Sequence, residues 1–370
     1  MGVTRVSFER GKGKGFARDL KQRVNAYFEE NGLSKHANAE MVVKTVVLLS
    51  LYFGAYTLIL TGWFSPLQML FFCFVMGIGM AGIGFSISHD ALHGAYSSNK
   101  KVNNILGLSF DLMGANGYIW KITHNVIHHT YTNIYEHDED LEVAEFIRLS
   151  PNAEHKPIHR AQHILAFFAY SFATLFWVFV KDYWYFLKPN LGPYENKTHP
   201  FSEWVTLIVT KLLYYSYMLV IPYLLLPIAW WQLLIGFLVV HLTAGLILGI
   251  IFQLAHVVEG TEHPEQNEEG NIENAWMIHQ METTANFAHD NKLLSWYIGG
   301  LNYQIEHHLF PKICSVHYPA ISRIVREVAD EYDVPYNYNE SFYKAIRSHY
   351  RTLKIFGQYK QVPAEHLPSY

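Results

Sequence analysis

The sequence predicts an all-α integral membrane protein with four transmembrane helices in two hairpins and a helical cap at one membrane face. Half of the 370 residues are hydrophobic and only 16% are charged, whereas soluble proteins carry about 25% charged residues. Four apolar stretches each approach the roughly 20 residues that a helix needs to cross the hydrocarbon core of a bilayer. These stretches cover residues 41–63, 66–88, 203–225 and 230–255.

Short connections pair the four stretches into two hairpins. The first pair is joined by residues 62–65, and the second pair turns around Pro222 and Pro227. The segments outside the hairpins must then lie on one side of the membrane. Nearly all Lys and Arg residues fall in these segments and none falls in either hairpin turn. The positive-inside rule therefore places both termini and the cap in the cytoplasm.

The remaining segments fit a cap at this membrane face. Residues 16–27 predict an amphipathic helix with Phe16, Leu20, Val24 and Tyr27 on one stripe, and this helix either lies on the membrane surface or is solvated. Two further stretches are apolar but too short or too interrupted to span the membrane, so we expect interfacial or re-entrant helices at 105–120 and 162–180.

We divide the chain into a basic N-terminal segment (1–40), a membrane domain (41–330) and a C-terminal tail (331–370). The neighbourhood from Cys314 to His317 and the tail with His349 and His366 have no apolar stretch of spanning length, and we expect them to be solvated surface.

Histidines recur in three clusters and at one further position. Residues four apart project from the same face of a helix, and a set of imidazoles suits transition metals rather than magnesium or calcium. The clusters follow or precede the apolar stretches, so the topology brings all of them to one membrane face. Their histidines are His89 and His93, then His124, His128 and His129, then His256, and finally His307 and His308.

Eight histidines exceed the three protein ligands of a typical catalytic zinc site, which suggests two metal ions. Gln304 could complete the ligand set through its amide oxygen or through a bound water. His241 lies about 22 Å along a helix from His256, too deep for the same cluster, and we expect it to be a packed membrane histidine.

Polar side chains near the histidines could orient the imidazoles by accepting a hydrogen bond from the second ring nitrogen. For the acidic run at 136–142 the alternative is an ordinary solvated face. The candidates are Asp90, Asp138, Asp140, Gln253 and Glu306.

Composition excludes other classes of site. A net charge of −4 argues against nucleic acid as a partner. Cys73 and Cys314 are far apart and form no CxxC pair, so neither a disulfide framework nor a cysteine zinc site is supported. No histidine has a glutamate three residues before it, so the Glu-x-x-His pattern of soluble diiron bundles is absent.

The words HDALH, HNVIHH and QIEHH, with FQLAH ahead of the third, resemble the three histidine boxes of membrane fatty acid desaturases. The third box opens with a glutamine, Gln304, and in this it resembles the third box of the front-end subgroup. Enzymes of that subgroup insert a double bond between an existing double bond and the carboxyl end of the chain. TTANFAHDN and GGLNYQIEHHLFPKICSVHYPAI are similar to bacterial members that are often labelled acyl-CoA or linoleoyl-CoA desaturases. The resemblance covers about residues 40–330 and implies a bacterial inner-membrane protein.

The resemblance also implies the chemistry. The histidines would hold two iron ions, a diiron site, with O2 as co-substrate, and a cis double bond would enter a long-chain acyl-CoA or acyl-lipid. The HPGG motif of a fused cytochrome b5 domain is absent, so electrons are expected from a separate donor such as ferredoxin or cytochrome b5 with its reductase. We also expect a narrow apolar acyl tunnel lined by aromatic residues near Trp120 and Trp276.

Three other functions remain open from the residues. A diiron hydroxylase would use the same histidines and release an alcohol. A membrane hydrolase would need a single zinc with three ligands. A metal-binding or transport protein would need polar residues spaced through the spans, where His241 stands alone.

Overall fold

The computed structural model describes residues 6–9, 13–142, 144–363 and 366. Almost all of the regular structure is helical, as predicted. The described strands form three ladders of two strands each. Two ladders are parallel, β1 (Ser7–Phe8) with β4 (Asn271–Ile272) and β5 (Ala285–Phe287) with β6 (Asn337–Asn339), and one is antiparallel, β2 (Asn190–Leu191) with β3 (Tyr194–Glu195).

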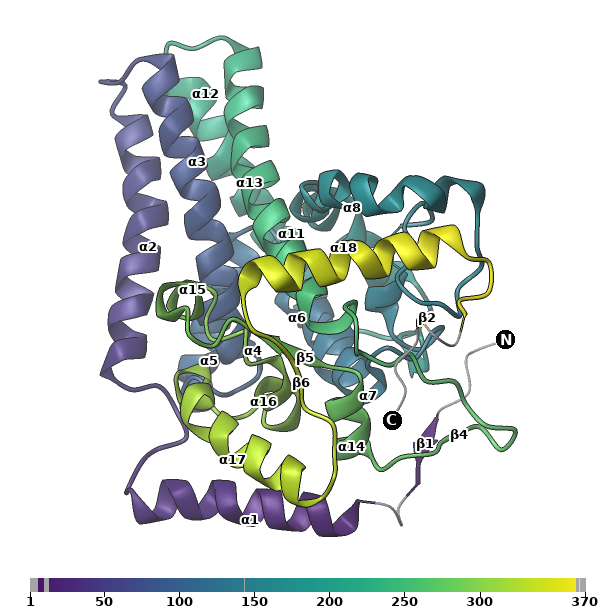
Figure 1. The fold of residues 1–370 in the computed structure, drawn as a ribbon. Helices are drawn as coiled ribbons and strands as arrows, with labels where there is room; N and C mark the ends of the chain where they lie inside the picture. The colour runs from purple at the N-terminus through teal and green to yellow at the C-terminus, as the bar shows by residue number, and fades with distance from the viewer. Residues whose placement is uncertain (1–5, 10–12, 143, 364–365, 367–370) are drawn as a thin grey trace.

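Four helical segments are long and apolar enough to cross a membrane, which confirms the predicted four-span fold class. Both hairpin turns lie at the same end of the molecule and the cap lies at the other (Figure 1). The segments are α2 (Ala39–Leu60); α3 (Pro66–Ile83) continued by the π-helical turn η1 (Gly84–Ser88) and α4 (His89–Leu92); α11 (Phe201–Tyr215) continued by η6 (Ser216–Val220) and α12 (Ile221–Leu225); and α13 (Trp230–His256).

The second helix of each hairpin begins with the same local hydrogen bond. The Gln68 Oε1 atom accepts a hydrogen bond from the Ser65 backbone N–H at 3.0 Å, and Gln232 Oε1 accepts one from the Ala229 N–H at 2.8 Å. A glutamine at the third helical position thereby satisfies a backbone donor that the helix leaves free. The chain can therefore reverse direction within five residues at the first turn and four at the second.

The two hairpins pack through α3 and α13, and small residues allow this close approach. A Cβ atom added at Gly77 would lie 2.7 Å from the Val240 carbonyl oxygen and 2.6 Å from the Thr243 Cβ. Hydroxyl groups add polar contacts between spans, since Tyr52 and Tyr217 lie 3.0 Å apart through their oxygens. Small residues at helix interfaces are typical of membrane bundles.

The cap is built from many short helices. The predicted apolar segment at 162–180 falls on two helical stretches, Pro157–Tyr170 and Ala173–Leu187, which meet at 69° as in a broken span or a re-entrant loop. The cap helices are α5 (Lys100–Leu112), α6 (Gly117–Trp120), η2 (Lys121–His128), α7 (His129–Tyr131), η3 (Glu139–Leu141), η4 (Pro157–Ala161), α8 (Gln162–Tyr170), α9 (Ala173–Phe176), η5 (Trp177–Lys181), α10 (Asp182–Leu187), α14 (Trp276–Glu282), α15 (Lys292–Tyr297), α16 (Gln304–Leu309), η7 (Ser315–His317), α17 (Tyr318–Glu331) and α18 (Phe342–Gln358).

The amphipathic N-terminal helix packs on protein. Helix α1 (Lys14–Glu30) buries Phe16, Leu20 and Val24 as predicted, with Phe28 completing the stripe in place of the half-buried Tyr27. This face joins the core of α17, and α1 and α17 run side by side at the bottom of Figure 1. The apolar stripe is thus a contact within the chain and not one with the membrane surface, whereas the opposite face, with Arg18, Lys21 and Gln22, is exposed.

The predicted solvated tail is wrong for most of its length. Helix α18 packs on α8, and His349 is fully buried, with Nδ1 2.7 Å from the Val257 carbonyl oxygen and Nε2 3.0 Å from the Tyr170 hydroxyl. Cys314 and His317 are also buried, since Cys314 packs with Met41 and Ala91 and His317 Nε2 lies 3.0 Å from the His36 carbonyl oxygen. His366 is exposed, as predicted.

Candidate metal centre

The eight histidines of the clusters come together in the interior of the cap. Their potential ligand atoms fall into groups whose members lie within 4.8 Å of one another. One group contains four residues, and three groups contain three. The groups are His89, His93, His124 and His307; His128, His256 and His308; His129, His307 and His308; and His124, His128 and Asp140.

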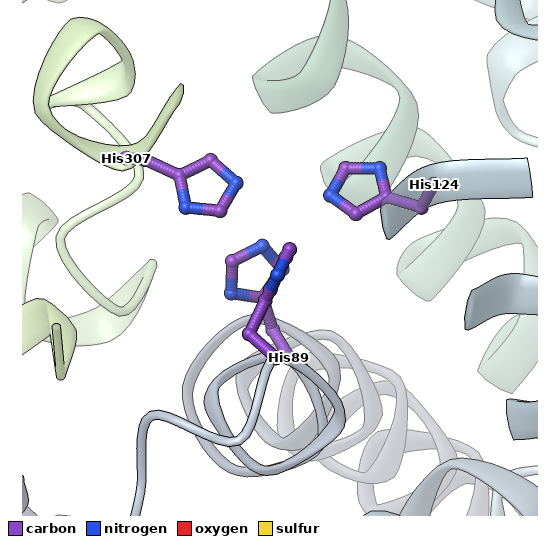
Figure 2. A group of neighbouring side chains, drawn as sticks. His89, His124 and His307 are labelled. Carbon is purple, nitrogen blue, oxygen red and sulfur yellow. The ribbon is translucent and has the colours of Figure 1, made fainter. Parts of the chain in front are cut away.

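Four separate parts of the chain deliver these side chains. His89 opens α4 and His93 follows it, His124 and His128 lie in η2, His129 opens α7, and α13 and α16 supply the rest. Figure 2 shows His89, His124 and His307 pointing their rings toward one another from different elements. The clusters therefore require the complete tertiary fold.

The second cluster lies on a π-helical turn and not on the α-helix expected from its spacing. Residues Lys121–His128 form η2, and η1 likewise leads directly into His89. The rings of His124 and His128 still stack, at 5.2 Å between centroids and 18° between planes. π-Helical turns are rare and often accompany functional sites. Here η1 and η2 occur where a helix presents histidines to the interior, whereas the π-helical turns η5 and η6 carry no histidine.

The hydrogen bonding of the imidazole nitrogens indicates whether these histidines can bind a metal. Within the described residues, seven of the eight histidines have a buried Nε2 atom without a hydrogen-bond partner, His89 being the exception. Burial costs a polar atom free energy unless it is satisfied. Burial also lowers the pKa of His93, His124, His129, His307 and His308 well below the usual histidine value, so these rings are neutral. Neutral imidazoles with a free nitrogen are the form that binds a metal.

Asp138 holds His128 from behind, as the sequence suggests. The Asp138 carboxylate lies 3.0 Å from His128 Nδ1 and also accepts the Asn133 backbone N–H at 3.1 Å. Asp140 lies farther away, at 3.8 Å from the same Nδ1. Burial lowers the pKa of His128, but the Asp138 charge and hydrogen bond outweigh it and raise the pKa. The ring is thereby fixed with Nδ1 as donor and Nε2 directed to the centre.

The other predicted orienting groups have different contacts. Asp90 lies 3.4 Å from His89 Nδ1, and it accepts shorter hydrogen bonds from the Ser315 backbone N–H and hydroxyl, at 3.0 and 2.9 Å. Glu306 accepts hydrogen bonds from Asn286 at 2.8 Å and Tyr336 at 3.0 Å instead of from an imidazole, and burial raises its pKa to about 7. Its contribution is to fix α16, which carries two of the histidines.

Gln253 and Gln304 are both buried. Within the described residues, the Gln253 Oε1 atom has no hydrogen-bond partner. Gln304 opens α16, one turn before His307 and His308. Its role as a ligand stays a prediction.

Three orienting contacts were missed. The Gln280 Oε1 atom accepts from His308 Nδ1 at 2.7 Å and from the Thr132 hydroxyl at 3.0 Å. His307 Nδ1 lies 3.2 Å from the Tyr318 hydroxyl. His256 Nδ1 lies 3.3 Å from the Thr283 carbonyl oxygen. No sequence pattern marks these partners, because each becomes a neighbour only through tertiary folding.

Comparison with known proteins identifies this arrangement. Residues 35–340 match the family described as Fatty acid desaturase. The chain belongs to the fatty acid desaturase family. It is therefore a multi-pass membrane oxidoreductase, as the histidine boxes suggested, and its buried histidines form a metal site of the kind expected for such an enzyme.

Curated relatives cover nearly the whole desaturase. It is 40% identical to the sn-1 linoleoyl-lipid 6-desaturase of Synechocystis sp., over 93% of this chain and 96% of the relative. It is 38% identical to the protein of the same name from Arthrospira platensis, over 95% of both chains. The acyl-lipid (8-3)-desaturase of Physcomitrium patens is 35% identical, over 91% of this chain and 71% of the relative.

His241 is separate from the desaturase centre, as its depth predicts. It is fully buried in α13, with Nε2 2.5 Å from the Tyr214 hydroxyl and Nδ1 3.0 Å from the Thr174 hydroxyl. It belongs to none of the potential metal groups of the described residues. Both ring nitrogens are occupied by hydrogen bonds, so His241 joins three spanning or cap helices.

Aromatic residues border the centre. The Trp120 ring stacks on His124 at 4.3 Å between centroids and 25° between planes. The Trp276 indole N–H donates to the His129 carbonyl oxygen at 3.0 Å. Both tryptophans thus lie next to the histidines, where the sequence suggested an acyl tunnel, and the tunnel itself stays a prediction.

Proposed function

We propose that this chain is an O2-dependent front-end desaturase that inserts a cis double bond into an acyl chain carried by a membrane lipid. The single observation that supports this most strongly is the buried cluster of eight histidines, seven of which have a free Nε2 atom within the described residues. The names of the relatives supply the substrate class, linoleoyl-lipid, and the position, carbon 6. The glutamine at the start of the third box, Gln304, agrees with the front-end subgroup.

We propose iron as the metal and two ions as the number. Bound iron with O2 supplies the removal of hydrogen from an unactivated C–H bond, which no side chain can perform as acid or base. Two partly separate groups support two ions, one built on His89, His93 and His124 and the other on His128, His256 and His308. His307 also belongs to the first group, and it forms a further group with His129 and with His308 of the second, so these residues link the two groups. Asp138, Gln280 and Tyr318 hold the rings so that their free nitrogens converge.

Electrons would come from a separate protein such as ferredoxin or cytochrome b5 with its reductase. The experiment expresses the chain in a bacterial host with linoleate and a ferredoxin system, beside His128→Ala, and determines double-bond positions by mass spectrometry. We expect a new bond at carbon 6 with wild type only, the position in the relatives' names. A hydroxylated product, or purified protein that holds a single zinc and no iron, would contradict the proposal.

We also propose that the metal centre and both termini lie in the cytoplasm of a bacterium. The basic residues outside the hairpins support this side. In a background without Cys73, Ser65→Cys in the first turn should react with a membrane-impermeant maleimide added outside intact spheroplasts. Lys354→Cys on α18 should react only after lysis. The reverse pattern would place the centre on the outer side.

A further inference from the structure

A cavity lies at the start of α2, next to the metal centre and distinct from it. Its volume is about 750 Å³, and α2, α15 and α17 contribute most of its walls. Such a volume is in the range of small-molecule sites. Its charged and aromatic lining includes Glu40, Lys44, Lys292, Trp296, Arg323 and Arg326.

Lys44 is the unusual residue of this cavity. Its side chain is only 3% exposed, and Nζ lies 5.7 Å from the centre of the Trp296 ring. Within the described residues, no carboxylate comes within 4.0 Å of this ammonium group. A buried ion without a partner costs several kcal/mol. An anion in the cavity would supply the missing partner.

The rim adds three more cations. Lys292, Arg323 and Arg326 are exposed, and none of them forms an ion pair within the part of the chain that the structure describes. Two carboxylates, Glu40 and Asp290, also line the cavity. Positive charge is therefore in excess, and arginine geometry suits phosphate, to which a guanidinium donates two parallel hydrogen bonds.

The position along α2 indicates where the anion comes from. Lys44 lies in the second turn of a helix that is apolar enough to span a membrane, so the cavity opens near the level of lipid headgroups. Basic pockets beside transmembrane helices bind anionic headgroups at this depth. A lipid phosphate thus fits the location better than a phosphate from solution.

Two hydrogen-bonded links connect the cavity to the histidines. Ser315 lines the cavity and donates to Asp90, the neighbour of His89. Tyr336 lines it as well and donates to Glu306, the neighbour of His307. Each path from the cavity to the histidines therefore passes through two hydrogen-bonded residues.

We propose that this cavity binds the phosphate-bearing headgroup of the lipid whose acyl chain is desaturated, an inference that rests on the proposed function. Lys44, Arg323 and Arg326 hold the phosphate. Glu40 and Asp290 accept hydrogen bonds from headgroup hydroxyls. Because positive charge is in excess in the cavity, a glycerol-phosphate headgroup with a net negative charge is preferred over a zwitterionic one that carries a quaternary ammonium.

The first test measures binding to the purified full chain in detergent by native mass spectrometry. The probes are dioctanoyl phosphatidylglycerol, dioctanoyl phosphatidylcholine and neutral dioctanoylglycerol. We expect preference for phosphatidylglycerol and about tenfold weaker binding in Lys44→Gln/Arg323→Gln, because charge-assisted hydrogen bonds contribute energies of that order. The matched control removes two exposed cations of α18, Arg347→Gln/Lys354→Gln, and should bind as wild type. Equal binding by both double variants would overturn the proposal.

Competition distinguishes a lipid headgroup from free phosphate. Inorganic phosphate and glycerol 3-phosphate are added at the concentration of the lipid. Retention of phosphatidylglycerol supports a headgroup site, because the lipid is also held by its acyl chains. Displacement by inorganic phosphate would identify a site for phosphate from solution and overturn the lipid assignment.

The second test separates this inference from the proposed function. With linoleoyl phosphatidylglycerol as substrate, Lys44→Gln/Arg323→Gln should raise KM about tenfold, matching the loss of binding. An unchanged KM in an active enzyme would overturn the headgroup assignment and leave the desaturase proposal intact. Failure of wild type to desaturate any supplied lipid, with iron and electron donor present and phosphatidylglycerol still bound, would overturn the proposed reaction and leave only a lipid site.

Discussion

The orientation of each imidazole is decided by one or two atoms behind it. Asp138 and Gln280 hold His128 and His308 through Nδ1, and the opposite nitrogen of each ring is then free for a metal. A carboxylate and an amide oxygen both accept from Nδ1, but only the carboxylate raises the basicity of the ring. The two histidines therefore differ in ligand strength although they lie in the same centre.

Gln280→Leu should weaken metal binding without unfolding the protein. The substitution conserves size and removes the acceptor of His308 Nδ1 and of the Thr132 hydroxyl. Loss of such an orienting group lowers metal affinity by about 10- to 100-fold. Metal content after dialysis against a weak chelator measures the effect, with Gln358→Leu on the exposed end of α18 as control. Equal metal content in both variants would contradict an orienting role.

His241 and His128 should behave differently when each is replaced by alanine. His128→Ala removes a ligand and should lose bound metal and activity. His241→Ala should keep its metal but destabilise the fold by about 1–3 kcal/mol, since the Tyr214 hydroxyl is left buried without its partner. Metal analysis together with thermal unfolding separates the two outcomes. Loss of all metal from His241→Ala would contradict the separation of these histidines.

At the scale of single residues, the sequence predicted the histidines and the support of His128 by Asp138, but not the supports Gln280, Thr283 and Tyr318. Histidine spacing is visible along the chain, whereas the contact between Gln280 and His308 joins two helices that fold together only in the complete structure. The burial of His349 was missed for the same reason, because Tyr170 and Val257 come from distant segments. The run 136–142 was ambiguous, and Asp138 is buried within it.

At the scale of elements, the four spans were predicted closely, because hydropathy over some 20 residues depends little on tertiary context. The π-helical turns were not predicted. A histidine spacing of four residues fits an α-helix and does not exclude a wider turn, so spacing alone cannot distinguish η2 from an α-helix. The packing of α1 on α17 could not be predicted without knowledge of the α17 surface, because an amphipathic stripe alone fits a membrane surface equally well.

Gly77→Ala tests how tightly α3 packs against α13. The added methyl group would lie 2.7 Å from the Val240 carbonyl oxygen, so the helices must separate, at a cost of about 1–3 kcal/mol. Gly54→Ala is the control, because nothing lies within 4 Å of that position and alanine favours a helix. Thermal unfolding in detergent should show a lower Tm for Gly77→Ala and an equal or higher Tm for Gly54→Ala. Similar values would show that the hairpins adjust freely.

At the scale of the whole molecule, the metal centre joins elements that are far apart in the sequence. Its ligand candidates come from α4, η2, α13 and α16, so bound metal would act as a crosslink between both hairpins and the cap. Removal of metal by a strong chelator should lower the Tm by about 5 °C, because a ligand at a thousand times its Kd stabilises the fold by about 4 kcal/mol and the unfolding entropy of a chain of this length is large. His128→Ala should unfold near the metal-free temperature before any chelator is added. Identical Tm values with and without metal would contradict a crosslinking role.

The order of the spans and histidines along the chain also determines when the metal centre can form during biosynthesis. Five of the eight histidines precede the second hairpin, His256 ends it, and His307 and His308 are translated after all four spans. A ribosome that has reached residue 300 has therefore produced most of the metal ligands but neither His307 nor His308. Three of the four groups contain at least one of these two histidines. The centre can close only after the membrane insertion of both hairpins is finished. In nascent chains stopped before His307, any bound metal should exchange with free metal in the cell. Released chains should retain their metal.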